Sequence, residues 1–467
     1  MKKTNRNAAS ASIGALLFMF CVLPAPIAWA GDAPAGPAPL TLADFCRRVL
    51  AYYPKLKAQG VGVEAAIARK LQAQAGFWPK LQGLAGATYG DDQVYVFGAL
   101  LRQRAFTQDD FDLDRLNNPN ARANFDAGLH GELPLFDAFQ TISKVRAAGH
   151  LAESARHDEA FATMEARLVA CDAYLNAVAV EKALAKAEEA CRNSEADIGQ
   201  AGELKEKGVV LGADFYAARV IFGSLRNIRN NLAAQKESAH ALLNILMGED
   251  PLKPVRIVAD LKEDNGAGAD LKAWLAQAYD LRPDLRSIKE AIRAQEAHVS
   301  GARAGAWPVI SAFGDLSENT GDFHAGGGSF AVGLKGSVDL FDPGYASRVK
   351  VAEKSLRRLE YEKDAAADAI ARDVSFEYAR LASLKANIPV LRDMAGDSDQ
   401  AVDLVLPLYR EGRKSIADLL DMRQGNIRTY QIYYSALAGA KNSALRLLFL
   451  SGQLNESKIP GVFGEGK

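Results

Sequence analysis

The sequence has few of the residues and motifs that mark common enzyme and metal-binding classes. Its 467 residues include only 4 cysteines and 6 histidines, and the histidines lack the spacing of metal ligands. It contains no G-x-S-x-G, H-E-x-x-H or P-loop motif, which argues against the hydrolase, metalloprotease and nucleotide-binding classes. Acidic and basic residues nearly balance, at 57 and 56, so nothing favours a nucleic-acid partner. We therefore expect no enzyme activity, no cofactor and no bound metal.

Long apolar runs are absent after residue 30. The first thirty residues hold one, "IGALLFMFCVL", which follows Lys2, Lys3 and Arg6 and precedes the small-residue site "AWA". This pattern predicts a cleaved secretory signal over residues 1–30. Without it the chain has 53 basic and 57 acidic residues, a net charge of −4. No later apolar stretch reaches eighteen residues, so the sequence excludes a transmembrane helix but not a membrane barrel.

Three cysteines remain after the signal. Cys171 and Cys191, if they share one helix, stand about 30 Å apart at ~1.5 Å per residue, which is beyond disulfide reach. We expect free, buried thiols.

The remaining chain contains two copies of one pattern. The segment that begins at Tyr52 matches the segment that begins at Leu281, and the tripeptide "LFD" at Leu135 recurs at Leu340. Further on the offset stays at 204 residues, pairing Gly208 with Gly412, Asp214 with Asp418, and Gly248 with Gly452. We predict a first structural repeat over 31–248, a linker over 249–268, a second repeat over 269–452 and a short tail over 453–467. The first repeat carries a 24-residue surplus between Pro79 and Leu135.

Each repeat is predicted to end in a long helical hairpin, over about 136–248 and 343–452. No proline occurs from Leu135 to Asp250, and apolar residues there recur at alternating steps of three and four, which is a heptad stripe. A helix from about Phe139 to Lys207 spans roughly 100 Å at ~1.5 Å per residue. That length suits an antiparallel hairpin and not a compact core.

Period-two segments precede the hairpins, within about 80–135 and 309–340. Apolar residues alternate with polar or small ones from Asn124 to Leu133 and from Ser329 to Val338, as in strands of about ten residues that cross a bilayer. A soluble sandwich edge is the alternative that this periodicity leaves open. Each repeat offers two strands, and four strands cannot close a barrel, while each open edge group in lipid costs several kcal/mol. The chain must therefore oligomerise if its strands lie in a membrane.

Two Trp-Pro pairs lie where the period changes. Proline lacks the amide donor and biases its predecessor away from helix, so each pair should mark the point where a helix gives way to a strand. The indoles suit the interfacial belt of a membrane protein. We expect these interface anchors at Trp78, Pro79, Trp307 and Pro308.

The sequence resembles the TolC family of outer-membrane efflux and secretion channels. The residues that carry the resemblance occur in both repeats and in order: Leu42 with Pro54, "AGFWP" and "AGAWP", "PLFD" and "DLFD", Gly208 with Asp214, and "YREGRKSIADLLD". The resemblance implies a mainly α fold with a small transmembrane β part. It implies a homotrimer whose twelve strands form one barrel and whose twelve long helices form a periplasmic tube. Such a channel lies in the outer membrane of a Gram-negative bacterium and works with a periplasmic membrane-fusion adaptor and an inner-membrane transporter.

The same resemblance assigns roles to the hairpin turns. In that family the turns lie at the periplasmic tip, where the tube narrows and the adaptor docks, which here selects Gly208, Val209, Gly412 and Ser415. Asp418 and Asp421 lie three apart on one helical face, and around a symmetry axis they form two acidic rings. The predicted pore gate comprises Asp214, Tyr409, Arg413, Lys414, Asp418 and Asp421. The alternative to a gate is that Asp418 and Asp421 are two surface carboxylates at the start of a helix, where the helix dipole favours negative charge. Lys414 departs from the arginine that is common in the family.

Two functions stay open at this point. The favoured one is passive exit of substrates that an inner-membrane transporter delivers, and the other is a structural or adaptor coiled-coil protein of the periplasm without a pore. Lipid-facing strands discriminate between them, because an adaptor needs none. The surplus segment from Phe97 to Asn118 is expected at the outer mouth, far from the helices.

Overall fold

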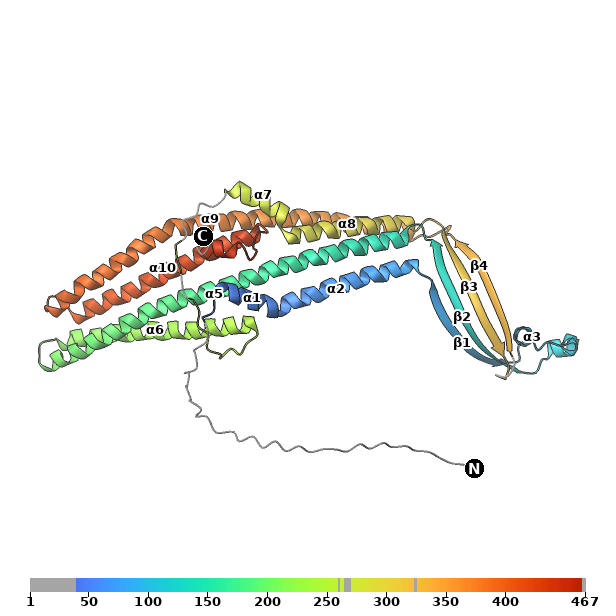
Figure 1. Cartoon of the computed structure of the whole chain (residues 1–467), viewed down its shortest axis with the longest axis horizontal. Coiled ribbons are helices and arrows are strands. Elements are labelled where there is room, and N and C mark those ends of the chain that lie inside the picture. The colour runs from blue at the N-terminus through green and yellow to red at the C-terminus, as the bar shows by residue number, and fades with distance from the viewer. Residues whose placement is uncertain (1–38, 259–260, 264–269, 323–325, 464–467) are drawn as a thin grey trace, which may run out of the picture. The chain divides into compact units, whose positions relative to one another are not determined.

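The computed structural model describes residues 39–258, 261–263, 270–322 and 326–463. The predicted signal peptide and parts of the linker lie outside these residues. Within the unit that begins at Pro39 the chain is mainly helical with one small sheet, as predicted (Figure 1). No helix in the described segments is long and apolar enough to cross a membrane.

The helices repeat in order. The first set comprises α1 (Leu42–Tyr52), α2 (Pro54–Gln74), α5 (Gln140–Glu206) and α6 (Gly212–Met247). The second comprises α7 (Leu271–Leu281), α8 (Pro283–Ala304), α9 (Tyr345–Arg410) and α10 (Ile416–Leu450), and a short α11 (Ile459–Phe463) follows. A proline opens both α2 and α8, where its fixed φ and missing donor suit the first helical position.

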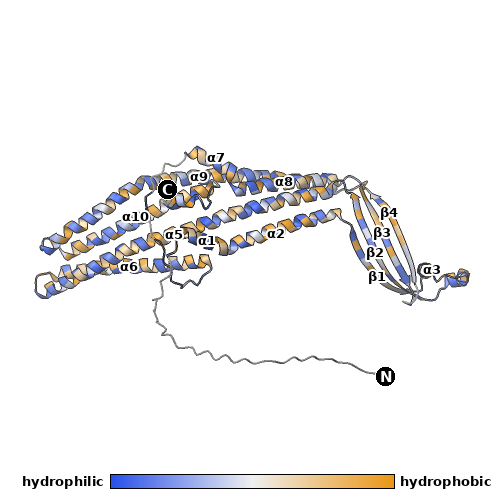
Figure 2. Ribbon diagram, in the orientation of Figure 1, coloured by the Kyte–Doolittle hydropathy of each residue, from blue (hydrophilic) through white to orange (hydrophobic). Residues whose placement is uncertain are grey.

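The two longest helices, α5 and α9, have 67 and 66 residues. The bounds of α5 confirm the helix predicted from Phe139 to Lys207. Helix α5 packs against α2, α6, α8 and α10, and many of its fully buried positions are alanines, which allow close approach of neighbouring helices. Orange and blue positions intermix along these helices (Figure 2), as expected for elements that bury one face and expose the other.

Four glycines with positive φ end the helices of the hairpins. Gly208 and Gly412 have φ of 72° and follow α5 and α9, while Gly248 and Gly452, at 73° and 75°, follow α6 and α10. Such left-handed caps favour glycine. A Cβ on Gly248 would lie 2.3 Å from the Tyr52 ring, and one on Gly452 would lie 2.7 Å from the carbonyl carbon of Leu281. In each repeat the glycine that ends the hairpin therefore packs against an equivalent residue, Tyr52 in the first repeat and Leu281 in the second.

The sheet joins the two repeats. Strands β1 (Lys80–Gly90), β2 (Arg122–Phe136), β3 (Val309–Thr320) and β4 (Gly326–Ser337) are antiparallel in the order β1-β2-β3-β4. The pairing of β2 with β3 connects the first repeat to the second. Among the described strands β1 and β4 are the edges, and each has one partner.

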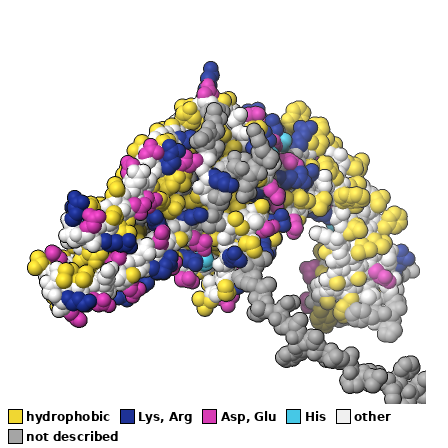
Figure 3. Space-filling view, turned by 60° about the vertical axis from the view of Figure 1, so that its left-hand side comes forward, with side chains coloured by type: hydrophobic (Ala, Val, Ile, Leu, Met, Phe, Trp, Pro, Cys, Tyr) yellow, Lys and Arg dark blue, Asp and Glu magenta, His cyan; other side chains and the backbone are white. Residues whose placement is uncertain are grey.

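One face of the sheet is apolar and exposed. Leu129 of β2 lies opposite Leu316 of β3, which lies opposite Phe330 of β4, and all three side chains are exposed. Hydrophobic side chains gather over the strands at the right of Figure 3. A soluble protein rarely exposes a contiguous apolar surface of this kind. The face therefore requires a covering that one copy of the chain does not supply.

The other face of the sheet is polar. His130 Nδ1 lies 2.6 Å from Asp315 Oδ1, and Asn124 donates to Asn319 across 3.0 Å. The Ser311 hydroxyl donates to Glu132 at 2.9 Å. These bonds all join β2 to β3, so a line of satisfied polar groups runs along the sheet opposite the apolar face.

Candidate functional site

The two hairpin turns at the far end from the sheet have the same backbone. At the first tip the amide of Val209 donates to Leu204 O at 2.9 Å, and at the second the amide of Arg413 donates to Leu408 O at 2.8 Å. Both bonds close the turn around the left-handed glycine. The next helices begin four residues after Gly208 and Gly412, which places Asp214 and Asp418 at equivalent positions in the first helical turn.

Asp418 takes part in a capping box. Its carboxylate accepts from the Ser415 amide at 3.1 Å, and its own amide donates to the Ser415 hydroxyl at 3.1 Å. The hydrogen bond from the Ser415 amide lowers the pKa of Asp418, so the group stays ionised at neutral pH. Asp418 therefore stabilises the start of α10, which is the structural role that the alternative to a pore gate assigns to it. The carboxylate also remains exposed, so capping is compatible with a place in a pore.

Helix α10 has an acidic exposed face and an apolar buried one. Asp421, like Asp418, is exposed, whereas Ile416, Leu419 and Leu420 are buried. The buried residues belong to a cluster contributed by α5, α6, α9 and α10, which is the core of the tip region. The two carboxylates therefore point away from this core, toward space that a neighbouring copy or solvent fills.

The other predicted gate residues differ in burial and in partners. Arg413 is exposed and pairs with Glu411 at 3.5 Å, and Lys414 is also exposed. Tyr409 is buried in the tip core, where burial and the charge of Asp197 raise the pKa of its hydroxyl. Within one chain Arg413 thus has a local partner. A tie from this tip to Asp214 of an adjacent hairpin stays a prediction.

An ion pair that the sequence did not predict lies just behind the tip. Arg423 of α10 is 2.5 Å from Asp197 of α5, and their side chains are only 7% and 14% exposed. The guanidinium also donates to the Ser194 hydroxyl at 3.2 Å. We call Arg423, Asp197 and Ser194 the tip latch. It fixes the second hairpin to the long helix of the first through a buried ion pair.

A second polar cluster joins the same helices one to two turns further from the tip. Asp399 of α9 accepts from Tyr430 at 2.5 Å and Asn426 at 2.8 Å on α10, and from Lys186 at 3.0 Å on α5. Burial alone raises the pKa of Asp399, but the hydrogen bonds from Tyr430, Lys186 and Asn426 outweigh it and lower that pKa. The cluster is therefore held together by an ionised carboxylate at neutral pH.

The Trp-Pro pairs lie where they were predicted, between helix and strand. Helix α2 passes into the 3-10 turn η1 (Ala75–Phe77) and then Trp78, Pro79 and β1, while Trp307 and Pro308 separate α8 from β3. Both indoles are exposed. Their role as interface anchors stays a prediction.

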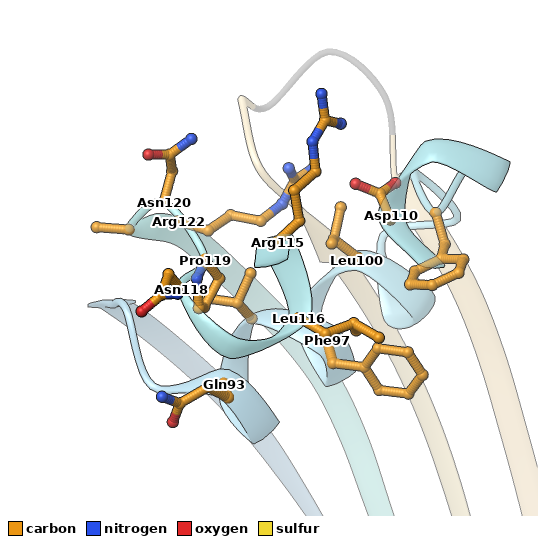
Figure 4. Close-up of a pocket in the computed structure, with 13 residues that line it drawn as sticks. Gln93, Phe97, Leu100, Asp110, Arg115, Leu116, Asn118, Pro119, Asn120 and Arg122 are labelled. Atoms are coloured by element: carbon orange, nitrogen blue, oxygen red, sulfur yellow. The ribbon is translucent and has the colours of Figure 1, made fainter. Parts of the chain in front are cut away.

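The connection between β1 and β2, which holds the surplus segment, forms short helices beyond the outer ends of the strands (Figure 1). It contains α3 (Gln93–Arg102), the 3-10 turn η2 (Gln108–Phe111) and α4 (Leu113–Asn117). Together with the start of β2 they line a cavity of about 340 Å³ (Figure 4). Gln103 donates to Ala123 O at 2.8 Å, and Arg104 donates to Gly328 O at 2.8 Å. The segment is thus anchored across the ends of β2 and β4.

Comparison with known proteins agrees with this architecture. The family model described as outer membrane efflux protein matches residues 274–453. The solved structure of the Campylobacter jejuni CmeC outer membrane channel has a TM-score of 0.75 at 18% identity, over 91% of this chain and 90% of that one. The second repeat thus matches the outer membrane efflux protein family, and the chain as a whole is similar to TolC-like outer-membrane channels. Its location is accordingly the outer membrane, and the family consists of channels and not enzymes.

Further relatives extend the similarity to the level of sequence. Protein CyaE of Bordetella pertussis is 24% identical over 334 residues, which are 70% of each chain. Outer membrane protein OprJ of Pseudomonas aeruginosa is 23% identical over 68% of this chain and 67% of that one. The Neisseria gonorrhoeae MtrE outer membrane channel, solved in its open state, has a TM-score of 0.71 at 20% identity. These TolC-like relatives match both repeats and not the second alone.

Proposed function

We propose that three copies of this chain form one channel, with twelve strands closing a barrel in the outer membrane and twelve helices forming a periplasmic tube. The observation that best supports this proposal is the sheet, which has one exposed apolar face and one polar face. Closure by neighbouring copies pairs the open edges of β1 and β4, which in lipid otherwise leave backbone groups unsatisfied at several kcal/mol each. The polar face then lines the lumen, and the apolar face meets lipid.

The channel gives passive exit to substrates that an inner-membrane transporter and a periplasmic adaptor deliver. A conduit needs a continuous polar path and no chemistry, and the polar line along β2 and β3 supplies that path through the sheet. The alternative, a periplasmic coiled-coil protein without a pore, gives no role to the exposed apolar face of the strands. That face favours the channel.

The proposal is tested on protein extracted from the envelope in detergent. Chemical crosslinking should yield a trimer, and reconstitution in planar bilayers should yield discrete conductance steps. A monodisperse monomer that gives no conductance would overturn both the assembly and the pore.

The helical tips are proposed to close the resting channel. The exposed carboxylates of Asp418 and Asp421, repeated three times about an axis, place two acidic rings at the narrow end. Such rings attract cations and repel anions within a constriction of low dielectric constant. The tip latch holds each second hairpin inward until a partner separates the hairpins, while Tyr409, Arg413, Lys414 and Asp214 are proposed to contribute contacts between adjacent hairpins.

Removing the two carboxylates should change ion selectivity. In planar bilayers the variant Asp418→Ala with Asp421→Ala is expected to lose most cation preference and to resist block by multivalent cations, because six negative charges leave the constriction. The matched control, Asp364→Ala with Asp368→Ala, removes the same charge from exposed positions of α9 remote from the tip and should conduct like the parent. Unaltered reversal potentials in the tip variant would place these aspartates outside the constriction.

The first hairpin tip is proposed to bear the adaptor contact. Val209 and Leu211 are 69% and 72% exposed there, and they adjoin Gly208, whereas the second tip around Gly412 and Ser415 presents Arg413 and Lys414. An adaptor that covers both tips buries an apolar patch beside a basic one.

Charge on that apolar patch should weaken adaptor binding. Val209→Asp with Leu211→Asp is expected to reduce copurification of the cell's periplasmic adaptor with a tagged channel at least tenfold, since burying an unpaired carboxylate is costly. Val220→Asp alters another exposed valine on α6 and serves as the control. Equal adaptor recovery with the tip variant and the control would move the docking site elsewhere.

A further inference from the structure

Two buried cysteines meet between the first helix and the central one. The sulfur atoms of Cys46 on α1 and Cys171 on α5 are 3.9 Å apart. Both thiols are buried and free in the structure, which confirms the expectation of buried thiols. The sequence alone excludes a disulfide between Cys171 and Cys191 on one helix and indicates no partner for Cys46. The structure brings together a pair separated by 125 positions.

The pair lies where the linker after α6 packs on the first repeat. Tyr174, one helical turn from Cys171, donates its hydroxyl to Leu40 O at 2.9 Å and to Val258 O at 3.0 Å. Leu40 in turn forms a parallel bridge with Ile257. The segment before α1 and the segment after α6 therefore converge on α5 beside the two thiols, and all belong to one apolar core.

We propose that Cys46 and Cys171 form a disulfide in the mature protein and so staple α1 to α5 where this linker packs. Bond formation brings the sulfur atoms from 3.9 Å to about 2.05 Å. The oxidant is a periplasmic dithiol oxidoreductase in its disulfide form, which the chain meets in the periplasm on its way to the outer membrane. Disulfides form and persist in that compartment.

The reaction proceeds by two exchange steps. The Cys46 thiolate attacks one sulfur of the oxidoreductase disulfide, whose S–S bond breaks, giving a mixed disulfide and one oxidoreductase thiolate. The Cys171 thiolate then attacks the Cys46 sulfur, forming the internal bond and releasing the second oxidoreductase thiolate. The two protons lost by the cysteines are taken up by these two thiolates. The channel loses two electrons, and the oxidoreductase gains them.

In the docked structure the contact shifts the pKa values of the two thiols in opposite directions. The hydrogen bond with Cys171 lowers the pKa of Cys46, and the charge of Arg167 acts in the same direction. The hydrogen bond to Cys46 and burial raise the pKa of Cys171. The thiolate is the attacking form. Because both sulfurs are buried in the packed core, the exchange takes place before α1 docks fully on α5, and docking then brings the two sulfur atoms together.

The third cysteine provides an internal control. Cys191 lies in the tip core, a different cluster from the one that holds Cys46 and Cys171. It also lies on α5, about 30 Å along the helix from Cys171 at ~1.5 Å per residue. The proposal therefore requires Cys191 to remain a thiol while the other two are oxidised.

The test is thiol counting on full-length channel purified from the envelope. Samples are quenched in acid, denatured and alkylated with a maleimide that adds mass, with and without prior reduction. One alkylated cysteine of the mature chain is expected before reduction and three after it, and peptide mapping should find Cys46 linked to Cys171. Three alkylated cysteines without reduction, or a linkage that involves Cys191, overturns the proposal.

Matched variants separate the staple from general effects on folding. Cys46→Ser should raise the unreduced count from one to two, because Cys171 loses its partner, whereas Cys191→Ser should lower it from one to zero. Reductant should lower the thermal unfolding temperature of the parent and of Cys191→Ser, but not of Cys46→Ser with Cys171→Ser. If the serine variants fail to accumulate, the peptide map of the unsubstituted protein still decides the question.

Discussion

Replacing Arg423 with leucine is expected to loosen the helical tips and to raise channel conductance. The substitution leaves Asp197 buried without its counter-charge, and breaking a buried pair from one side costs about 3–5 kcal/mol. The loss falls on the contact that holds α10 to α5 behind the turn. Three such losses in a trimer shift the proposed gate toward its open form. Larger single-channel conductance in planar bilayers is the direct measurement, and leakage of large antibiotics into cells is the cellular one.

Two control variants show whether the ion pair itself carries the effect. Arg410→Leu removes a basic side chain that is exposed at the end of α9, so its conductance should match the parent. Arg423→Leu with Asp197→Leu removes both charges, and replacing a buried pair by apolar residues is often neutral for stability. The double variant should therefore regain thermal stability relative to Arg423→Leu. A single variant that conducts and unfolds like the parent would assign the latch no part in gating.

The repeats and hairpins could be predicted because their signals are local and periodic. A heptad stripe without proline specifies a long helix wherever the chain lies, and the bounds of α5 follow from it. Left-handed caps favour glycine, which agrees with the turns that the family resemblance assigned to Gly208 and Gly412. The period-two segments around Leu129 and Phe330 likewise specified which side chains share a face of the sheet.

Contacts between distant segments could not be predicted from the same signals. Arg423 lies on the same helical face as Ile416, Leu420 and Ile427. Its place in this apolar stripe is the sequence signal that indicates its burial. Nothing in that spacing identifies Asp197 or Ser194, the latter separated from Arg423 by 229 positions. The family resemblance selects Arg413 and Lys414, which are exposed, and not Arg423, which packs inside.

The short helices between β1 and β2, in the connection that holds the surplus segment, were not predicted, for a related reason. The residues from Val94 to Leu101 are mostly apolar, and a short apolar run has no decisive period. The side chain of Asp92 accepts from the Tyr95 amide at 2.9 Å and caps α3, which is the local signal that favours helix. The way Arg104 reaches β4 depends on the sheet register, which the sequence of the segment does not contain.

An arginine on the apolar face of the sheet should prevent assembly, whereas the same arginine one residue later should not. Leu316 lies near the middle of β3 between Leu129 and Phe330, on the proposed lipid side. A lipid-facing arginine at the bilayer midplane costs about 2–4 kcal/mol, hence roughly 6–12 kcal/mol for three copies. Ser317 faces the opposite side, where its hydroxyl lies 3.0 Å from that of Ser329 and water solvates an added charge. Leu316→Arg should therefore greatly reduce the amount of heat-dissociable trimer in the outer membrane, and Ser317→Arg should retain it with altered ion selectivity. Equal loss of trimer in both variants would mean that the two faces of the sheet do not meet lipid and water as proposed.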